Sequence, residues 1–91
     1  MAEFDPKTAV ITGGASGIGL ALAKRLAGQG EQVLVADLPG PALDRAERLV
    51  GITAHPCDVS DLDQVEALAD AAFDQFETVD LLLNNAGQGG V

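Results

Sequence analysis

The sequence predicts an α/β fold in which helices cover both faces of a parallel, doubly wound β-sheet. Short, nearly uncharged apolar runs alternate with longer segments whose apolar residues recur at helical spacing, in the order strand, helix, strand, helix, strand, helix, strand. With 91 residues, the chain has room for one small domain. Because right-handed crossovers join parallel strands, we expect the strand order 3-2-1-4 with three crossover helices.

The first strand and the first helix surround a turn rich in glycine. Residues 8–12 are apolar or β-branched, which is typical of a buried strand. A helix is expected to begin at Gly17, because its apolar residues recur on one side while the charged ones lie on the other. Gly28 and Gly30 then end this helix.

The middle of the chain repeats the same alternation. Residues 32–37 form a short, apolar second strand that ends in an acid, which is typical of a strand buried on both faces. Apolar spacing predicts a second helix over residues 43–51. A third strand follows over residues 52–57, although His55 and Pro56 weaken it and suggest a short or edge position.

The last pair of elements completes the predicted sheet. Ser60 and Asp63 resemble a capping box, and helical spacing continues to Phe76. Residues 79–85 predict a fourth strand. With the order 3-2-1-4, the first two helices lie on one face and the third on the other, and a crevice opens between the carboxyl ends of strands one and four.

Composition limits the classes of partner. The formal charge of −9 argues against binding to nucleic acid and to anionic membrane surfaces, so a small-molecule ligand is expected. Cys57 is the single cysteine, which excludes an internal disulfide and fits a reducing compartment. The chain shows neither a secretory signal at its start nor an apolar run long enough to span a membrane. We therefore expect a cytoplasmic protein.

The glycine-rich turn is suited to an anion, because the first turn of a helix offers unpaired N–H groups and the positive end of its dipole. Gly13 permits the tight turn, Gly17 lets the backbone approach a pyrophosphate, and Gly19 lets the helix pack closely on the strand. The spacing T-G-x-x-x-G-x-G differs from the common fingerprint G-x-G-x-x-G, and no Lys-Ser or Lys-Thr follows as in a P-loop. A turn without a ligand therefore remains the alternative to a dinucleotide site.

Asp37 ends the second strand, where a dinucleotide fold needs an acid for the adenosine ribose hydroxyls. A solvated carboxylate at a strand end is the alternative. A 2′-phosphate within about 4 Å of this carboxylate would be repelled by roughly 1–4 kcal/mol. Neither Ser16 nor Leu38 supplies a compensating positive charge, so the sequence favours NAD over NADP.

Four stretches together resemble the N-terminal half of the short-chain dehydrogenase/reductase family: Thr12-Gly-Gly-Ala-Ser-Gly-Ile-Gly19, Asp37, Asp58-Val59 and Asn84-Asn85-Ala86-Gly87. The motifs T-G-x-x-x-G-I-G and N-N-A-G stand in the family's order and near its spacing. The resemblance implies a partial Rossmann-like NAD(P)-binding domain over residues 1–91. It also implies a homo-oligomeric parent oxidoreductase that transfers a hydride between NAD(P) and an alcohol or carbonyl substrate.

By this resemblance, each motif contacts a different part of the dinucleotide. Ser16, Gly17, Ile18 and Gly19 would face the pyrophosphate, with Gly13 in the turn; Asp37 and Leu38 would contact the adenosine ribose; Asp58 would accept from the adenine amino group, with the Val59 backbone beside it; Asn85, Ala86 and Gly87 would border the ribose and the path toward nicotinamide. Two alternatives stay open. Asp58 could instead cap a turn before Ser60, and Asn84 could serve the sheet rather than the ligand.

The family's catalytic Tyr-x-x-x-Lys motif has no counterpart here, because the chain has no tyrosine and its lysines are Lys7 and Lys24. Hydride transfer to a carbonyl needs a proton donor that the cofactor cannot supply. We therefore expect a cofactor-binding piece that is truncated after the fourth strand and inactive alone. No catalytic residue and no metal site is expected in it.

Two other functions remain open at this stage. The chain could be a self-contained, non-catalytic nucleotide-binding or interaction module, although its apolar fourth strand would then be a bare sheet edge. It could also belong to a methyltransferase or another Rossmann-like enzyme. The spacing from Gly13 to Gly17 and the stretch from Asn84 to Gly87 suit the dehydrogenase better.

Overall fold

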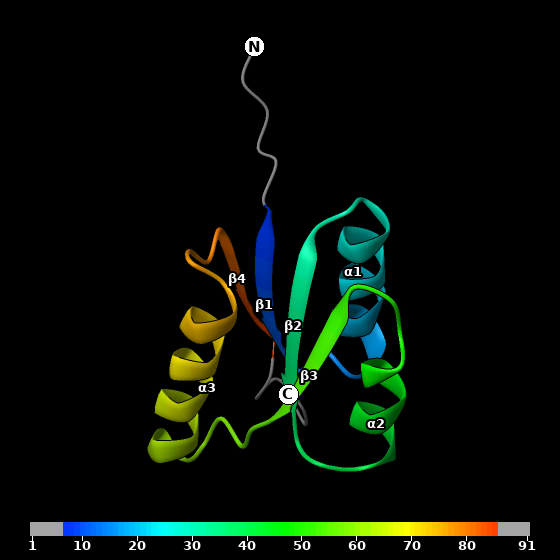
Figure 1. Ribbon diagram of the computed structural model, residues 1–91. Helices are drawn as coiled ribbons and strands as arrows, with labels where there is room; N and C mark the ends of the chain where they lie inside the picture. Colours follow the sequence, from blue (N-terminus) through cyan, green and yellow to red (C-terminus); the bar gives the residue numbers. More distant parts are fainter. Residues whose placement is uncertain (1–6, 86–91) are drawn as a thin grey trace.

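The computed structural model describes residues 7–85, in which strands and helices alternate as the sequence predicts (Figure 1). The strands are central and the helices flank them on two sides. The elements are β1 (Thr8–Thr12), α1 (Gly17–Gly28), β2 (Gln32–Asp37), α2 (Pro41–Glu47), β3 (Ile52–Pro56), α3 (Leu62–Gln75) and β4 (Leu81–Asn84).

The four strands form one sheet in the order β3-β2-β1-β4, and every neighbouring pair is parallel. The predicted order is therefore confirmed. Thr12 at the end of β1 pairs with Ala36 of β2 on one side and with Asn84 of β4 on the other. The direction of chain travel across the sheet reverses at this strand, so the crevice expected at such a reversal lies between β1 and β4.

The core has two layers, one on each face of the sheet. Side chains along a strand point alternately to opposite faces, so Ile11 packs with α1 and α2 whereas Val10 packs with α3. The prediction that the first two helices share one face and the third covers the other is confirmed (Figure 1). All five residues of β1 are buried, which explains why this strand carries no charge.

Two predicted boundaries are wrong. The second helix ends at Glu47 rather than near Gly51, because the chain turns there: Gly51 has a φ of 84° and the Ile52 N–H donates to the Leu49 carbonyl. The fourth strand begins at Leu81 rather than at residue 79. The preceding residues are held instead by the Thr8 hydroxyl, which donates to the Thr78 carbonyl at 2.7 Å.

The predicted cap of the third helix is also wrong. Asp61, not Ser60, is the residue at the N-cap, and its side chain accepts from the Asp63 N–H at 3.0 Å. The Ser60 hydroxyl is used elsewhere, because it donates to the Asp58 carboxylate at 2.6 Å. Both residue types are good caps, but Gln64 three residues later gives Asp61 the Glu or Gln of a capping box, which Ser60 lacks.

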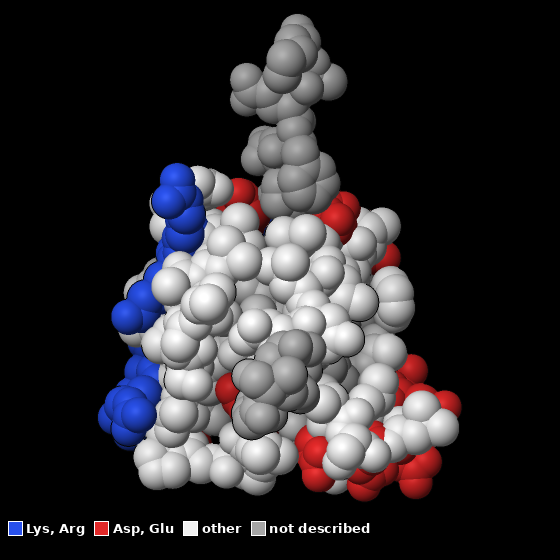
Figure 2. Space-filling view, turned by 180° about the vertical axis from the view of Figure 1, so that it is seen from behind, with Lys and Arg blue, Asp and Glu red and all other residues white. Residues whose placement is uncertain are grey.

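Charge is divided between the two flanks of the sheet. Figure 2 shows Lys and Arg side chains gathered along the flank of α1 and α2, and Asp and Glu gathered toward the opposite flank. The third helix carries four acidic residues and no basic ones in its sequence LDQVEALADAAFDQ. Within residues 7–85, no helix is long and apolar enough to cross a membrane.

Candidate functional site

The predicted site residues gather at the carboxyl edge of the sheet, which is the lower edge in Figure 1. The strands are parallel, so the residues that follow β1, β2 and β4 all emerge at this edge. The Gly13 N–H donates to the Ala36 carbonyl at 2.7 Å, which joins the glycine-rich loop to the end of β2. Three stretches that are distant in sequence thus meet around one loop.

The glycine-rich loop leads into the start of α1, which no side chain caps. Gly13 and Gly17 have φ values of 67° and 59°, in the left-handed region that favours glycine. Ser16 is the N-cap of α1, yet its side chain makes no capping hydrogen bond, and the first turn contains no acidic residue. The N–H groups of that turn and the positive end of the helix dipole are therefore available to an anion.

Close packing explains two further glycines. A Cβ on Gly19 would meet the Gly13 carbonyl oxygen at a forbidden distance and the Asn85 Nδ2 at 2.9 Å. A Cβ on Gly14 would meet the Val35 Cβ at 2.8 Å. The tight fit expected for Gly19 is present. The sequence pattern does not single out Gly14, because the need for a glycine there comes from Val35 of the neighbouring strand β2.

Asp37, at the end of β2, lies against the glycine-rich loop. Its Oδ2 accepts from the Ala15 N–H at 3.1 Å, and its Oδ1 accepts from the Leu38 N–H at 2.8 Å. These two bonds fix the orientation of a half-buried carboxylate. The Leu38 side chain beside it is exposed.

Asp58 occupies the loop between β3 and α3. Its Oδ1 accepts from the hydroxyl of Ser60 at 2.6 Å and from the Ser60 N–H at 3.0 Å, so the turn-capping interpretation describes one of its oxygens. Within residues 7–85, its Oδ2 has no hydrogen-bond partner. The hydroxyl of Ser60, followed by its N–H, lowers the pKa of Asp58, so this carboxyl remains an acceptor.

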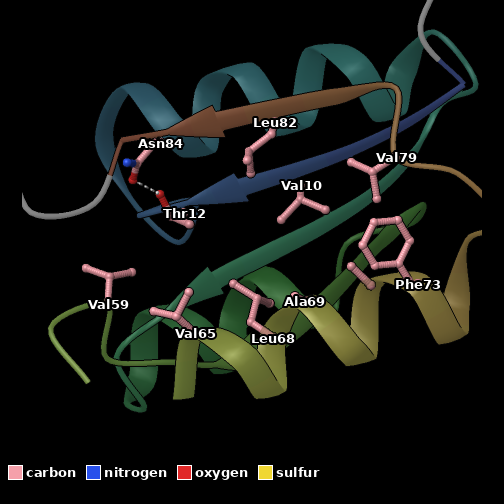
Figure 3. A pocket seen from close by; sticks show the side chains of 11 residues that line it. Val10, Thr12, Val59, Val65, Leu68, Ala69, Phe73, Val79, Leu82 and Asn84 are labelled. Atoms are coloured by element: carbon pink, nitrogen blue, oxygen red, sulfur yellow. Dashed lines mark hydrogen bonds between the residues drawn. The ribbon is translucent and has the colours of Figure 1, made fainter. Parts of the chain in front are cut away.

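The end of β4 is bonded to both the first strand and the loop. The Thr12 hydroxyl accepts from the Asn85 N–H at 2.9 Å and lies 3.0 Å from the Asn84 Oδ1, to which it donates (Figure 3). The Asn85 amide donates to the Gly13 carbonyl at 3.2 Å. Asn84 therefore has the sheet-serving contact that one interpretation predicted. Ala86 and Gly87, which complete the predicted motif, lie outside the described residues.

An apolar groove of about 530 Å³ adjoins this edge. It runs between α3 and the strands β1 and β4, and Val59, a predicted site residue, lies at one end of it (Figure 3). Thr12 and Asn84 provide polar groups among its apolar lining. Phe73 and Leu82 in its walls are exposed. Within residues 7–85, no group of three His, Cys, Asp or Glu residues could hold a metal ion.

Comparison with known proteins gives a consistent result. A family model described as short chain dehydrogenase matches residues 7–91. The 1-deoxy-11-beta-hydroxypentalenate dehydrogenase of Streptomyces exfoliatus is 48% identical over 90 residues, which cover 93% of this chain and 33% of that protein. An uncharacterized oxidoreductase of Mycobacterium tuberculosis is also 48% identical over 90 residues, covering 90% of this chain and 26% of the relative.

Two solved structures share the fold. A variant of the actinorhodin polyketide ketoreductase with NADPH superposes with a TM-score of 0.81 at 36% identity, covering 97% of this chain and 36% of the other. A short chain dehydrogenase/reductase from Burkholderia phymatum in complex with NAD gives 0.80 at 44% identity, covering 90% and 31%. The chain spans about a third of the length of the relatives it matches.

Proposed function

Since this chain belongs to the short-chain dehydrogenase family, whose model matches residues 7–91, we propose that it binds a nicotinamide dinucleotide at the carboxyl edge of its sheet. It would form the cofactor-binding part of an oxidoreductase that transfers a hydride between that cofactor and an alcohol or carbonyl substrate. The observation that carries the proposal is that the Asp37 carboxylate accepts from the Ala15 N–H, beside the start of α1, where no side chain caps the helix.

The pyrophosphate is assigned to the first turn of α1. Ser16, Gly17 and Ile18 are exposed there, and the helix end presents N–H groups without a side-chain cap. A Cβ on Gly17 would meet no protein atom within 4 Å, so the space beside it is free for a ligand. Gly13 and Gly19 shape the turn, because they pack so closely that a Cβ on Gly19 would collide with the Gly13 carbonyl oxygen.

The adenosine ribose is assigned to Asp37 and Leu38, and the preferred cofactor is NAD. A carboxylate held in place by two N–H donors can accept from ribose hydroxyls but repels a 2′-phosphate. At about 4 Å the repulsion is on the order of 1–4 kcal/mol. The basic residues of α1 and α2 lie on the outer flank of the sheet in Figure 2 and are not at positions 16 or 38.

The adenine is assigned to Asp58 and Val59. The Asp58 Oδ2 is the acceptor for the adenine amino group, since the Oδ1 is occupied by Ser60. Asn85, together with Ala86 and Gly87 beyond the described range, is assigned to the border of the ribose and the path toward nicotinamide. The bond from the Asn85 amide to the Gly13 carbonyl supports this assignment, because it holds the Asn85 side chain against the glycine-rich loop.

The division of chemistry follows from these assignments. The bound nicotinamide supplies or accepts the hydride, and the residues of this chain bind and orient the dinucleotide. The family's Tyr-x-x-x-Lys motif has no counterpart in the sequence, so the proposal gives this chain no proton-transfer step. We expect residues 1–91 to bind the cofactor without turning over a substrate.

Calorimetric titration of the full 91-residue chain with NAD, NADP and S-adenosylmethionine tests the proposal. We expect NAD to bind, NADP to bind more weakly and S-adenosylmethionine not to bind. Binding of S-adenosylmethionine without NAD would instead favour a methyltransferase. A cooperatively unfolding chain that binds none of the three would contradict the proposal.

A further inference from the structure

The loop between β3 and α3, residues 57–61, is held together by one side chain from the helix. The Gln64 Oε1 accepts from the Asp58 N–H at 2.8 Å, and its Nε2 donates to the Asp61 Oδ2 at 3.2 Å. The backbone carbonyl of Gln64 also accepts from the Cys57 thiol at 3.6 Å. The carboxamide of Gln64 therefore spans the loop from Asp58, the second residue after β3, to Asp61, which caps α3.

This contact replaces a bond that the sheet cannot provide. The last bond from β2 to this segment joins the Cys57 N–H to the Asp37 carbonyl at 2.8 Å. The next N–H, that of Asp58, lies beyond the end of the sheet and is taken by Gln64. The orientation of the Asp58 backbone is thus set from α3 rather than from β3.

The side chain of Asp58 completes the arrangement. Ser60 occupies its Oδ1 through two bonds, while Gln64 fixes its backbone from the other side. The Asp58 Oδ2 has no hydrogen-bond partner among the described residues and is left as an acceptor. Because its backbone N–H and its Oδ1 are both held in place, Asp58 presents the Oδ2 as a preorganised acceptor for a single donor.

We propose that Gln64 is a positioning residue for adenine recognition: it holds Asp58 so that the free Oδ2 meets the 6-amino group. This inference rests on the proposed function, since it needs a dinucleotide at the carboxyl edge. Glutamine is required because it accepts at one end of the loop and donates at the other. Glutamate at this position would face the Asp61 carboxylate at 3.2 Å.

The test compares NAD with nicotinamide hypoxanthine dinucleotide, in which a carbonyl oxygen replaces the 6-amino group. The wild-type chain should bind NAD more tightly by roughly tenfold, the value expected for one charge-assisted hydrogen bond. In Gln64→Glu and Gln64→Met, NAD affinity should fall until the two ligands bind equally, while affinity for the analogue changes little. A general loss of structure would weaken both ligands alike.

The controls separate this inference from the proposed function. Gln75→Glu alters a glutamine of the same helix whose amide donates to Thr53 at 2.9 Å, far from Asp58, and should leave the ratio unchanged. Asp58→Ala should abolish the preference, and Gln64→Met should then have no further effect on it. Thermal unfolding establishes that each variant is folded.

Different failures have different meanings. If the folded wild-type chain binds neither dinucleotide, the proposed function fails and this inference fails with it. If Asp58→Ala removes the preference for NAD but Gln64→Met and Gln64→Glu retain it, the positioning role alone is overturned. A wild-type chain that binds both dinucleotides equally would overturn the role of Asp58 in reading the adenine amino group, and that of Gln64 with it.

Discussion

The Asp37 carboxylate accepts a hydrogen bond from the Ala15 N–H at 3.1 Å, so the end of β2 and the glycine-rich loop are joined by a side chain. This contact gives Asp37 two roles, one in fixing the loop and one in facing the ribose. The two roles can be separated by experiment, because asparagine removes the charge and keeps one acceptor oxygen, which can serve the Ala15 N–H while the bond from the Leu38 N–H is lost.

Asp37→Asn should therefore narrow the difference in affinity between NAD and NADP by about 1–4 kcal/mol, since the repulsion of a 2′-phosphate is lost. Stability in urea should fall by about 0.5–1.5 kcal/mol, because one of the two bonds to Asp37 is lost while the bond to Ala15 is kept. Calorimetric titration with both cofactors measures the effect. Asp70→Asn, an exposed acid on α3, is the matched control and should change neither value. An unchanged ratio in Asp37→Asn would limit Asp37 to its structural role.

Gly19→Ala should destabilise the fold, because its Cβ would be driven into the Gly13 carbonyl. Overpacking of this kind costs about 1–3 kcal/mol. Gly28→Ala changes the same residue type in the same helix, where a Cβ meets nothing within 4 Å, and should be neutral or stabilising. Urea unfolding of both variants makes the comparison. Equal stabilities would argue against the tight contact beneath the loop.

Thr8 and Thr12 hold the two ends of the β1–β4 pair in the same way. Each hydroxyl accepts a backbone N–H from the β4 segment, that of Asp80 at 3.0 Å and that of Asn85 at 2.9 Å. Thr8→Val and Thr12→Val should each destabilise the fold by about 0.5–1.5 kcal/mol, the net contribution of one partly buried hydrogen bond. Only Thr12→Val should also weaken NAD binding, and titration measures this. Equal losses of NAD affinity would show a general effect of stability.

Cys57 should react slowly in the folded chain. Burial raises the pKa of its thiol, and the charges of Asp58 and then Asp61 raise it further. Because the folded pKa is the higher one, the contribution of the thiol to stability is present below the unfolded pKa and is lost as the pH rises through the folded pKa. Alkylation by iodoacetamide, followed from neutral to alkaline pH in the folded and urea-unfolded chain, measures the difference. Equal rates would contradict the raised pKa.

Much of the fold follows from local pattern. The apolar runs, the helical spacing and the handedness of crossovers are sufficient for the strand order, and they correctly assign α1 and α2 to one face and α3 to the other. The positions of Gly13, Gly17, Gly19 and Asp37 around one edge follow as well, because Gly13 follows a strand, Asp37 terminates one, and Gly17 and Gly19 begin the helix after β1.

The remaining details depend on which of several possible side-chain contacts form. Ser60 fits the capping pattern, but it bonds to Asp58, and Asp61 caps the helix. Gly14 is needed because of Val35, a residue of another strand. Asp61 and Gln64 have the D-x-x-Q spacing of a capping box, but the bond from the Asp58 N–H to the Gln64 Oε1 lies outside that pattern. The contact of Gly14 becomes visible only when the glycine-rich loop and β2 are placed in space.

The bonds that fix β4 join residues far apart in the chain: Thr12 and Asn85 are separated by 73 positions, and Thr8 and Thr78 by 70. Closing so long a loop costs more chain entropy than pairing β1 with β2. We therefore expect β4 to dock onto β1 after β1 and β2 have paired. The border of the candidate site that contains Asn85 forms only in that step. Folding of the last strand and completion of the site are consequently the same event, and a ligand that contacts both sides would favour it by mass action.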